Sequence, residues 1–113
     1  MAHQFLDEAS YLLVTFEGLI TEKELEEVQT DWDSFNKKFK KVIFSLEKVE
    51  YINSSALREI IRIYKKVMQN KGEFVIVINN RSLLDLFEFT GLCKLFEIRP
   101  SLKEAQQFLK VSS

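Results

Sequence analysis

Three consecutive apolar residues, Val42-Ile43-Phe44, constrain the fold of this chain more than any other feature. They lie within a segment from Lys41 to Leu46 that is predicted to be a β-strand. Successive side chains of a strand point to opposite faces of the sheet, so a strand that is apolar at consecutive positions is covered on both faces. Such strands are typical of parallel sheets with helices on both sides. The segment therefore predicts an α/β protein.

Strand and helix patterns alternate along the rest of the chain. Further strands are predicted at residues 10–16, 73–78 and 95–98, and a short one at 4–6 before a turn at 7–9. Helices are predicted to begin at Thr21, to span 56–67, to run from Ser82 to Gly91 and to begin at Ser101 before a tail at 111–113. This order predicts one small α/β domain over residues 1–113, with a mainly parallel sheet and four helices.

Three of these helices have a marked apolar stripe. The first helix carries Leu25, Val28, Trp32, Phe35 and Phe39. The second is predicted to bury Leu57, Ile60, Ile61, Tyr64, Val67 and Met68. The last is predicted to bury Leu102, Ala105, Phe108 and Leu109. The outer side of the second helix, called the basic face below, carries Arg58, Arg62, Lys65 and Lys66.

The composition is that of an ordinary globular protein. Hydrophobic residues make up 46% of the 113 residues, and the formal net charge is −1. A dedicated nucleic-acid binder would carry a strong basic excess, so no direct nucleic-acid binding is expected. No apolar run approaches the roughly 20 residues that span a bilayer, and the N-terminus has no secretory signal. With Cys93 as the only cysteine, the chain is expected to be cytoplasmic, with no membrane attachment.

The sequence lacks the residue sets of common catalytic and metal sites. His3 is the only histidine and lies near the terminus, so no Ser-His-Asp or Cys-His set is expected. One histidine and one cysteine do not make a zinc site. The phosphate-binding patterns GxxxxGK[ST] and GxGxxG are absent. We therefore expect no enzymatic activity, no metal and no cofactor.

The candidate functional site is Asn53-Ser54-Ser55, where the predicted strand gives way to the helix over 56–67. A helix N-terminus offers unpaired backbone N–H groups and the positive end of the macrodipole. A phosphate on a serine here would be stabilised and would change the local charge by about −1.5 to −2. The alternative is that Asn53 or one of the serines is only the N-cap.

The first turn of this helix differs from those of the other three predicted helices. Each of those begins with a Ser or Thr that an acid follows three residues later, in the pairs Thr21/Glu24, Ser82/Asp85 and Ser101/Glu104. The residues three positions beyond Asn53, Ser54 and Ser55 are Ala56, Leu57 and Arg58. Either this cap is simply weaker, or a carboxylate is absent so that an anion can be accommodated.

Three segments resemble the STAS domain family, which includes the bacterial anti-sigma-factor antagonists. The stretch 46–57 is similar to the family's signature, in which Asp-Leu and a spacer precede Asp-Ser-Ser-Gly-Leu. The stretch 89–98, followed by 101–105, resembles the family's C-terminal pattern, and 16–21 resembles its first strand-to-helix turn. The resemblance covers nearly the whole chain and implies a small α/β domain whose strand–helix units wind as a superhelix.

The resemblance also implies a function. Known members are regulatory binders and not enzymes, and a typical soluble member binds an anti-sigma factor that is also a serine kinase. The kinase phosphorylates the first serine of the Asp-Ser-Ser turn, which weakens binding, and a serine phosphatase removes the phosphate. By this correspondence Ser54 is the phosphoacceptor, and Asn53, Ser55 and Ala56 form the neighbouring switch turn. The oligomeric state is left open.

Three positions depart from the family's pattern. Asn53 and Ser45 stand where Asp is usual, and Ala56 stands where Gly is usual. Two other functions stay open: a constitutive scaffold subunit of a STAS assembly, and a sensor that captures a nucleotide or another anion at the same helix N-terminus. The basic face either meets an acidic partner surface or is a solvated helix surface.

Overall fold

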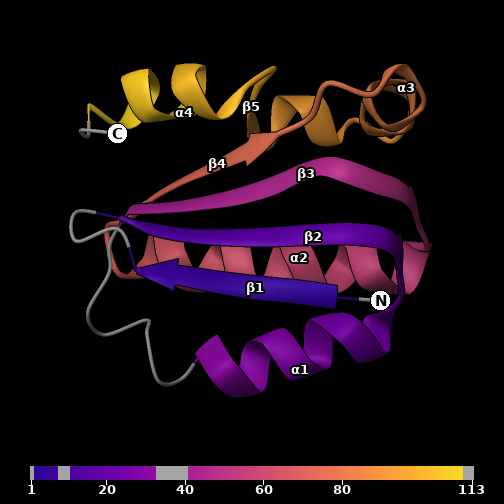
Figure 1. Ribbon diagram of the computed structural model, residues 1–113, viewed down its shortest axis with the longest axis horizontal. Coiled ribbons are helices and arrows are strands. Elements are labelled where there is room, and N and C mark those ends of the chain that lie inside the picture. The colour runs from indigo at the N-terminus through magenta and orange to yellow at the C-terminus, as the bar shows by residue number, and fades with distance from the viewer. Residues whose placement is uncertain (1, 8–10, 33–40, 111–113) are drawn as a thin grey trace.

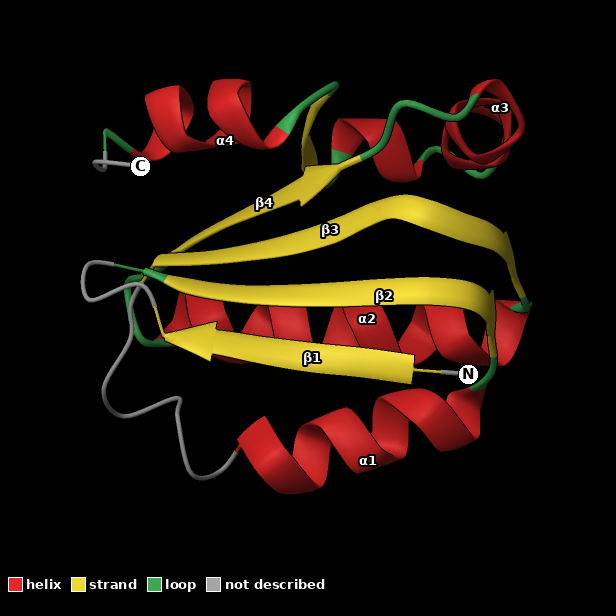
Figure 2. Ribbon diagram, in the orientation of Figure 1, coloured by secondary structure: helices red, strands yellow, loops and turns green. Residues whose placement is uncertain are grey.

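The computed structural model describes residues 2–7, 11–32 and 41–110. Its elements are β1 (Ala2–Asp7), β2 (Leu12–Ile20), α1 (Glu22–Trp32), β3 (Lys41–Ile52), α2 (Ser54–Gln69), β4 (Glu73–Val77), α3 (Arg81–Phe89), the 3₁₀ helix η1 (Leu92–Lys94), β5 (Glu97–Arg99) and α4 (Leu102–Leu109). The strands form one sheet in the order β1-β2-β3-β4-β5 (Figures 1 and 2). β1 is antiparallel to β2, and all other neighbouring pairs are parallel. The predicted α/β class, with a mainly parallel sheet and four α-helices in the described residues, is confirmed.

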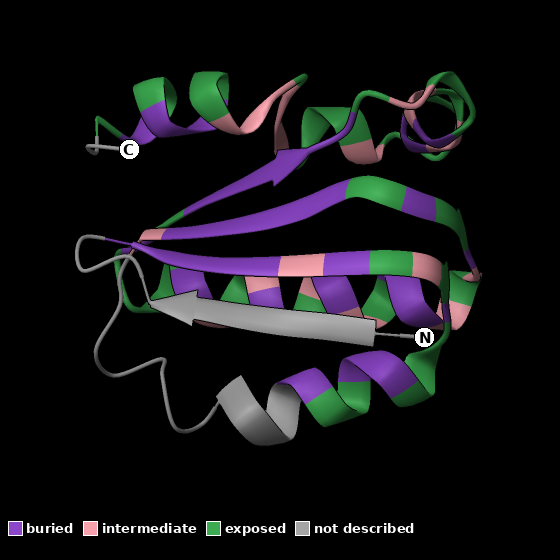
Figure 3. Cartoon of the chain, viewed as in Figure 1, coloured by how far each residue is buried: buried purple, intermediate pink, exposed green. Residues whose placement is uncertain are grey.

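Helices cover both faces of the sheet, as the consecutive apolar residues of β3 predict. Val42 and Phe44 belong to the main core cluster, which includes residues of α1, α2 and α3. Ile43 belongs to a smaller cluster that lies beneath α4. Figure 1 shows α4 at the top of the view and α2 on the other side of the sheet, and Figure 3 shows β3 buried along much of its length. β3 is therefore the central strand, as predicted.

Polar contacts anchor α4 to the sheet. Gln106 Nε2 donates to the Tyr11 hydroxyl at 2.6 Å, and both side chains are buried. Lys41 Nζ donates to the backbone carbonyl of Leu109 at 2.8 Å, at the last turn of α4. Because α4 is only 8 residues long, about 12 Å, it covers one part of its sheet face and leaves the remainder open.

β3 runs to Ile52, well beyond its predicted end at Leu46. Two register shifts interrupt its pairing with β2, so this part of the strand contains extra residues, as in β-bulges. The buried residues of the extension, Val49 and Ile52, are three positions apart rather than two. This spacing breaks the period-two alternation by which strands are predicted, so the extension of β3 is not predicted from the sequence.

The apolar stripes predicted for the helices are buried only in part. α1 buries Leu25 and Val28 as predicted. In α2, Met68 was predicted to be buried but is 44% exposed, whereas Ile63, which was not predicted, is fully buried. In α4, Phe108 was predicted to be buried but is 40% exposed. Both wrongly assigned side chains line an open pocket instead of the core.

Some predictions concern parts of the chain outside the described residues. These are the side chain of Trp32, residues Phe35 and Phe39, most of the predicted turn at 7–9 and the tail at 111–113.

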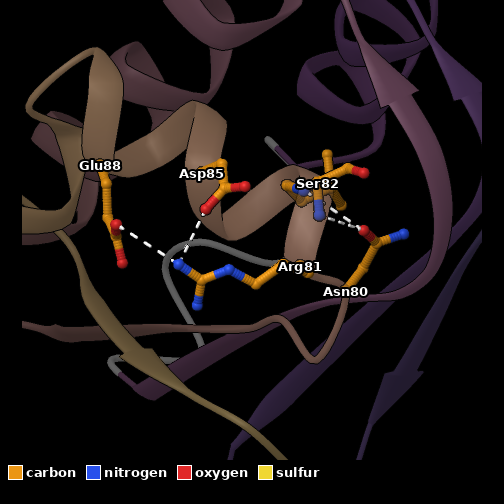
Figure 4. Close-up of polar contacts among 6 residues, drawn as sticks. Asn80, Arg81, Ser82, Asp85 and Glu88 are labelled. Carbon is orange, nitrogen blue, oxygen red and sulfur yellow. Dashed lines mark hydrogen bonds and ion pairs between the residues drawn. The ribbon is translucent and has the colours of Figure 1, made fainter.

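The predicted Ser82/Asp85 cap of α3 is wrong. The helix begins at Arg81, and its N-cap is Asn80, whose Oδ1 accepts from the backbone N–H of Ser82 at 2.8 Å and of Leu83 at 3.3 Å (Figure 4). Asp85 pairs with Arg81 at 2.9 Å, one helical turn away. An Asn placed two residues earlier outcompetes Ser82 because its carbonyl reaches two N–H groups at once.

The boundaries after α3 also differ from the prediction. α3 ends at Phe89, Gly91 takes a left-handed conformation with φ of 80°, and η1 follows. The last strand is Glu97–Arg99 rather than 95–98. The α4 cap is as predicted, since Ser101 Oγ accepts from the Glu104 N–H at 3.2 Å.

Candidate switch site at the start of α2

Asn53 is the N-cap of α2. Its extended backbone, with φ of −81° and ψ of 166°, turns the chain from β3 into the helix, and its Oδ1 accepts from the Ala56 N–H at 2.8 Å. Its own N–H donates to the carbonyl of Ile20 at 3.2 Å, which ties the turn to the end of β2. The helix begins at Ser54, two residues before the predicted start, because Asn53 and not a serine performs the capping.

Ser54 is the first residue of α2 and is exposed. Ser55 beside it is half-buried, and its Oγ accepts from Arg58 Nη2 at 3.2 Å. The two serines therefore differ: Ser54 presents its hydroxyl to solvent, whereas Ser55 holds a guanidinium one helical turn further on. The expected position of Ser54, in the first turn and away from the core, is confirmed.

Ala56 is fully buried and belongs to the main core cluster. Its methyl group thus packs inward and does not obstruct the approach of another molecule to Ser54. The presence of Ala at this position is compatible with an open switch turn.

The first turn of α2 contains no acidic side chain, and Arg58 lies close to it. The positive end of the helix dipole is therefore not compensated by a carboxylate of its own first turn. The predicted contrast with all three other helices is wrong in one case, because the first turn of α3 also lacks an acid. α1 and α4 do have acids there, at Glu22 and Glu24 and at Glu104.

The residues of the basic face lie along one side of α2. Arg58, Arg62 and Lys65 are exposed, and Lys66 is half-buried. Arg62 Nη1 pairs with Glu59 Oε1 at 3.0 Å in an i,i+3 contact. The Arg62 side chain is exposed and that of Glu59 is largely buried, so part of the positive charge of the basic face is already paired within the helix.

A pair of exposed apolar side chains lies beside the switch turn, and the sequence did not single it out as a site. Leu19 of β2 and Tyr51 of β3 are register partners, and they are 58% and 57% exposed. Each precedes a residue that is buried in the main cluster, Ile20 or Ile52, so both point to the face of the sheet that α4 leaves open. We call these two residues the Leu19–Tyr51 patch. Figure 3 shows β2 and β3 becoming exposed toward this end.

The described residues contain no group of three or more His, Cys, Asp or Glu side chains placed to hold a metal ion. No helix in the same part of the chain is both long enough and apolar enough to cross a bilayer.

Comparison with models of protein families identifies the domain. The model of the STAS domain matches residues 5–105, which include β2, β3 and the whole of α2. The chain belongs to the STAS domain family. The predicted family is thereby confirmed, and Asn53-Ser54-Ser55 lies within the matched region.

Individual relatives have the same domain. BtrV of Bordetella bronchiseptica, which is named as an anti-sigma factor antagonist, is 22% identical over 102 residues, covering 89% of this chain and 88% of that protein. The structure of TM1081 of Thermotoga maritima, named in the same way, has a TM-score of 0.86 at 21% identity and covers 96% of this chain and 94% of its own. The phosphorylated form of the Bacillus cell fate determinant SpoIIAA has a TM-score of 0.74 at 14% identity, covering 96% and 99%. At these identities the structures establish the fold.

Ser45, one of the positions that depart from the family's pattern, contacts a carboxylate of the same strand. Ser45 stands where Asp is usual, and its buried Oγ donates to Glu47 Oε1 at 3.3 Å. The other oxygen of Glu47 accepts from Asn79 Nδ2 at 3.3 Å, which links β3 to the residues after β4. A carboxylate is therefore present next to Ser45, supplied by a residue two positions later.

Proposed function

We propose that this chain is a regulatory binding module of the anti-sigma factor antagonist type, and not an enzyme. Its partner is an anti-sigma factor that is also a serine kinase. Phosphorylation of Ser54 by that partner lowers the affinity, and a serine phosphatase restores it, all in the cytoplasm. The observation that carries the proposal is the division of roles at the start of α2, where Asn53 supplies the cap and Ser54 presents an exposed hydroxyl.

The relatives and the electrostatics support this assignment. BtrV bears the name of an anti-sigma factor antagonist, and SpoIIAA has been solved in a phosphorylated and an unphosphorylated form. In this chain the first turn of α2 has no acid to repel a phosphate on Ser54, and the Arg58 guanidinium lies one turn away. A phosphate here would be tolerated by the fold while changing the surface that a partner meets.

The partner interface is proposed to consist of the Leu19–Tyr51 patch together with the exposed start of α2. Backbone hydrogen bonding from Asn53 to Ile20 holds these two surfaces next to each other. An exposed aromatic side chain beside an exposed leucine is the kind of surface that supplies interface hot spots. A dianion at Ser54 would then lie at the edge of an apolar contact that excludes water.

Phosphorylation itself is the direct test. Incubation with the cognate kinase and ATP, followed by mass spectrometry, is expected to locate a single phosphate on Ser54, and Ser54→Ala should remove it. Asn53→Asp is the matched control, because Asp is an equally good N-cap and restores the acid that the family usually has. Phosphate on Ser55 alone would contradict the assignment of Ser54. Absence of phosphate in both the natural chain and Asn53→Asp would favour a constitutive scaffold.

The Leu19–Tyr51 patch gives a second prediction. Tyr51→Ser is expected to weaken binding of the partner captured from native lysate about 30-fold, because about 2 kcal/mol is typical of an aromatic hot spot. Tyr51→Phe should retain most of the affinity, since the ring remains. Stability should hardly change, because Tyr51 is exposed.

Isothermal titration calorimetry measures these affinities. Met68→Ser is the control, since Met68 is also an exposed apolar residue but lies near the other end of α2. Equal losses of affinity for Tyr51→Ser and Met68→Ser would show that the patch is not the docking surface.

A further inference from the structure

The end of α2 opposite Ser54 borders a pocket that the proposed switch does not use. Its volume is about 310 Å³, and it lies among the second half of α2, the start of β4, the segment from η1 to β5, and α4. Tyr64, the first α2 residue to line it, is ten residues beyond Ser54, which is about 15 Å along a helix. We call it the α2–α4 pocket. It is a site separate from the switch turn, and a ligand could bind there whether or not Ser54 is phosphorylated.

Exposed apolar side chains are concentrated at this pocket. Within the described residues six large hydrophobic side chains are exposed, and three of them, Met68, Leu95 and Phe108, line this one pocket. Met68 comes from α2, Leu95 from the turn after η1 and Phe108 from α4. An apolar surface that is gathered in a concave site and left open to solvent is typical of a place where another molecule binds.

Aromatic rings form much of the lining. Tyr64 meets Phe96 edge-on at 5.1 Å and Phe74 edge-on at 5.7 Å between ring centroids. Phe108 lies on the α4 side, and the Arg99 guanidinium sits over its ring at 4.9 Å from the centroid. A side-chain cation of this protein therefore already occupies an aromatic face next to the pocket, as expected from the negative potential above such rings.

The charged residues of the lining are two acids and one base. Glu73 and Glu97 contribute carboxylates, and Lys94 contributes an ammonium group. Glu97 pairs with Arg99, a neighbour on the same strand. Glu73 is exposed and, within the described part of the chain, forms no ion pair. The carboxylate that remains available to a ligand is thus next to aromatic and apolar surface.

We propose that the α2–α4 pocket binds a small amphiphilic organic cation, which consists of an ammonium group attached to a flat apolar body. The body would contact Met68, Leu95 and the aromatic rings, and the ammonium group would lie at the Glu73 carboxylate. The Lys94 ammonium group repels a cationic ligand, so it lowers the affinity without excluding organic cations from the pocket. The volume is near the lower limit for ligand pockets, which suits a ligand with one ring system.

Tryptamine and indole-3-acetate are the matched probes, because they share the indole body and differ in the sign of their charge. Titration of the full chain is followed by ¹H–¹⁵N correlation spectra. Tryptamine is expected to give saturable shifts at residues of the pocket, including Cys93 and Leu95, without comparable shifts at Ser54. Indole-3-acetate is expected to bind at least 10-fold more weakly.

Two exposed charges provide the variants, and neither substitution disturbs the core. Glu73→Gln should weaken tryptamine binding about 5-fold and strengthen that of indole-3-acetate, because the carboxylate attracts the cation and repels the anion. Lys94→Gln should strengthen tryptamine binding about 3-fold and weaken that of indole-3-acetate. Phe89→Ser, a change at an exposed aromatic residue outside the pocket lining, should alter neither.

Three results would overturn the proposal. The first is the absence of saturable tryptamine shifts at millimolar concentration. The second is a set of shifts centred away from the pocket. The third is equal affinity for the two probes together with no effect of Glu73→Gln, since the site would then not select a cation.

Discussion

The chain phosphorylated on Ser54 is expected to bind its proposed partner about 100-fold more weakly than the unmodified chain. This difference corresponds to roughly 3 kcal/mol of binding free energy. The free chain is expected to accommodate the dianion, because it would lie at a helix N-terminus without a competing acid and near Arg58. In the proposed complex the same dianion would lose water next to the Leu19–Tyr51 patch. Unless the partner supplies donors, that loss is uncompensated. Calorimetric titration of the phosphorylated and unmodified chains measures the difference.

The substitutions at Ser54 separate binding from stability. Ser54→Glu should weaken binding less than phosphate does, because it has one negative charge and fewer acceptor oxygens. Ser54→Ala should retain full affinity and lose regulation. Because Asn53 and not Ser54 caps α2, Ser54→Ala should lower the free energy of unfolding by less than the roughly 0.5–2 kcal/mol that is typical of a lost cap. Undiminished binding by the phosphorylated chain and by Ser54→Glu would reject the switch.

The part of the fold that the sequence predicts well is the part that follows a simple period. Val42, Ile43 and Phe44 predict a central strand with helices on both faces, and this strand is found in the middle of the sheet. The extension of β3 to Ile52 is not predicted, because register shifts break the alternation. That extension determines where Tyr51 lies, so the exposed patch beside the switch turn could not be derived from the sequence.

The candidate site itself was partly predictable. The family resemblance leads to Ser54, and the helix pattern places it at the start of α2, where it is found. Which residue performs the capping could not be decided, since Asn and Ser are both good caps. The same ambiguity explains the error at α3, where Asn80 takes the role assigned to Ser82. Met68 and Phe108 fit a helical stripe, but only the tertiary structure shows that they line a pocket.

The largest effect on stability is expected for Phe44→Ala, at about 3–5 kcal/mol of unfolding free energy. Phe44 is fully buried in the central strand, with ring centroids 5.3 Å from Phe16 and 4.8 Å from Phe74. Its truncation removes apolar burial and leaves a cavity between the sheet and the helices that pack on this face. Urea unfolding followed by circular dichroism measures the change. Phe108→Ala is the matched control, because the same atoms are removed from a side chain that is 40% exposed, and it should cost about 1 kcal/mol or less.

Phe44→Ala also distinguishes an effect on the stability of the fold from an effect on the switch at Ser54. Domains of this size are stable by about 5–15 kcal/mol, so a loss of about 3–5 kcal/mol leaves a marginally folded protein. Its apparent partner affinity should fall only by the fraction that is unfolded, because Asn53, Ser54 and Tyr51 are unchanged in the folded molecules. Phosphorylation of Ser54 should do the opposite, with a large loss of affinity and little change in the urea midpoint. Equal costs for Phe44→Ala and Phe108→Ala would contradict the central position of β3 in the core.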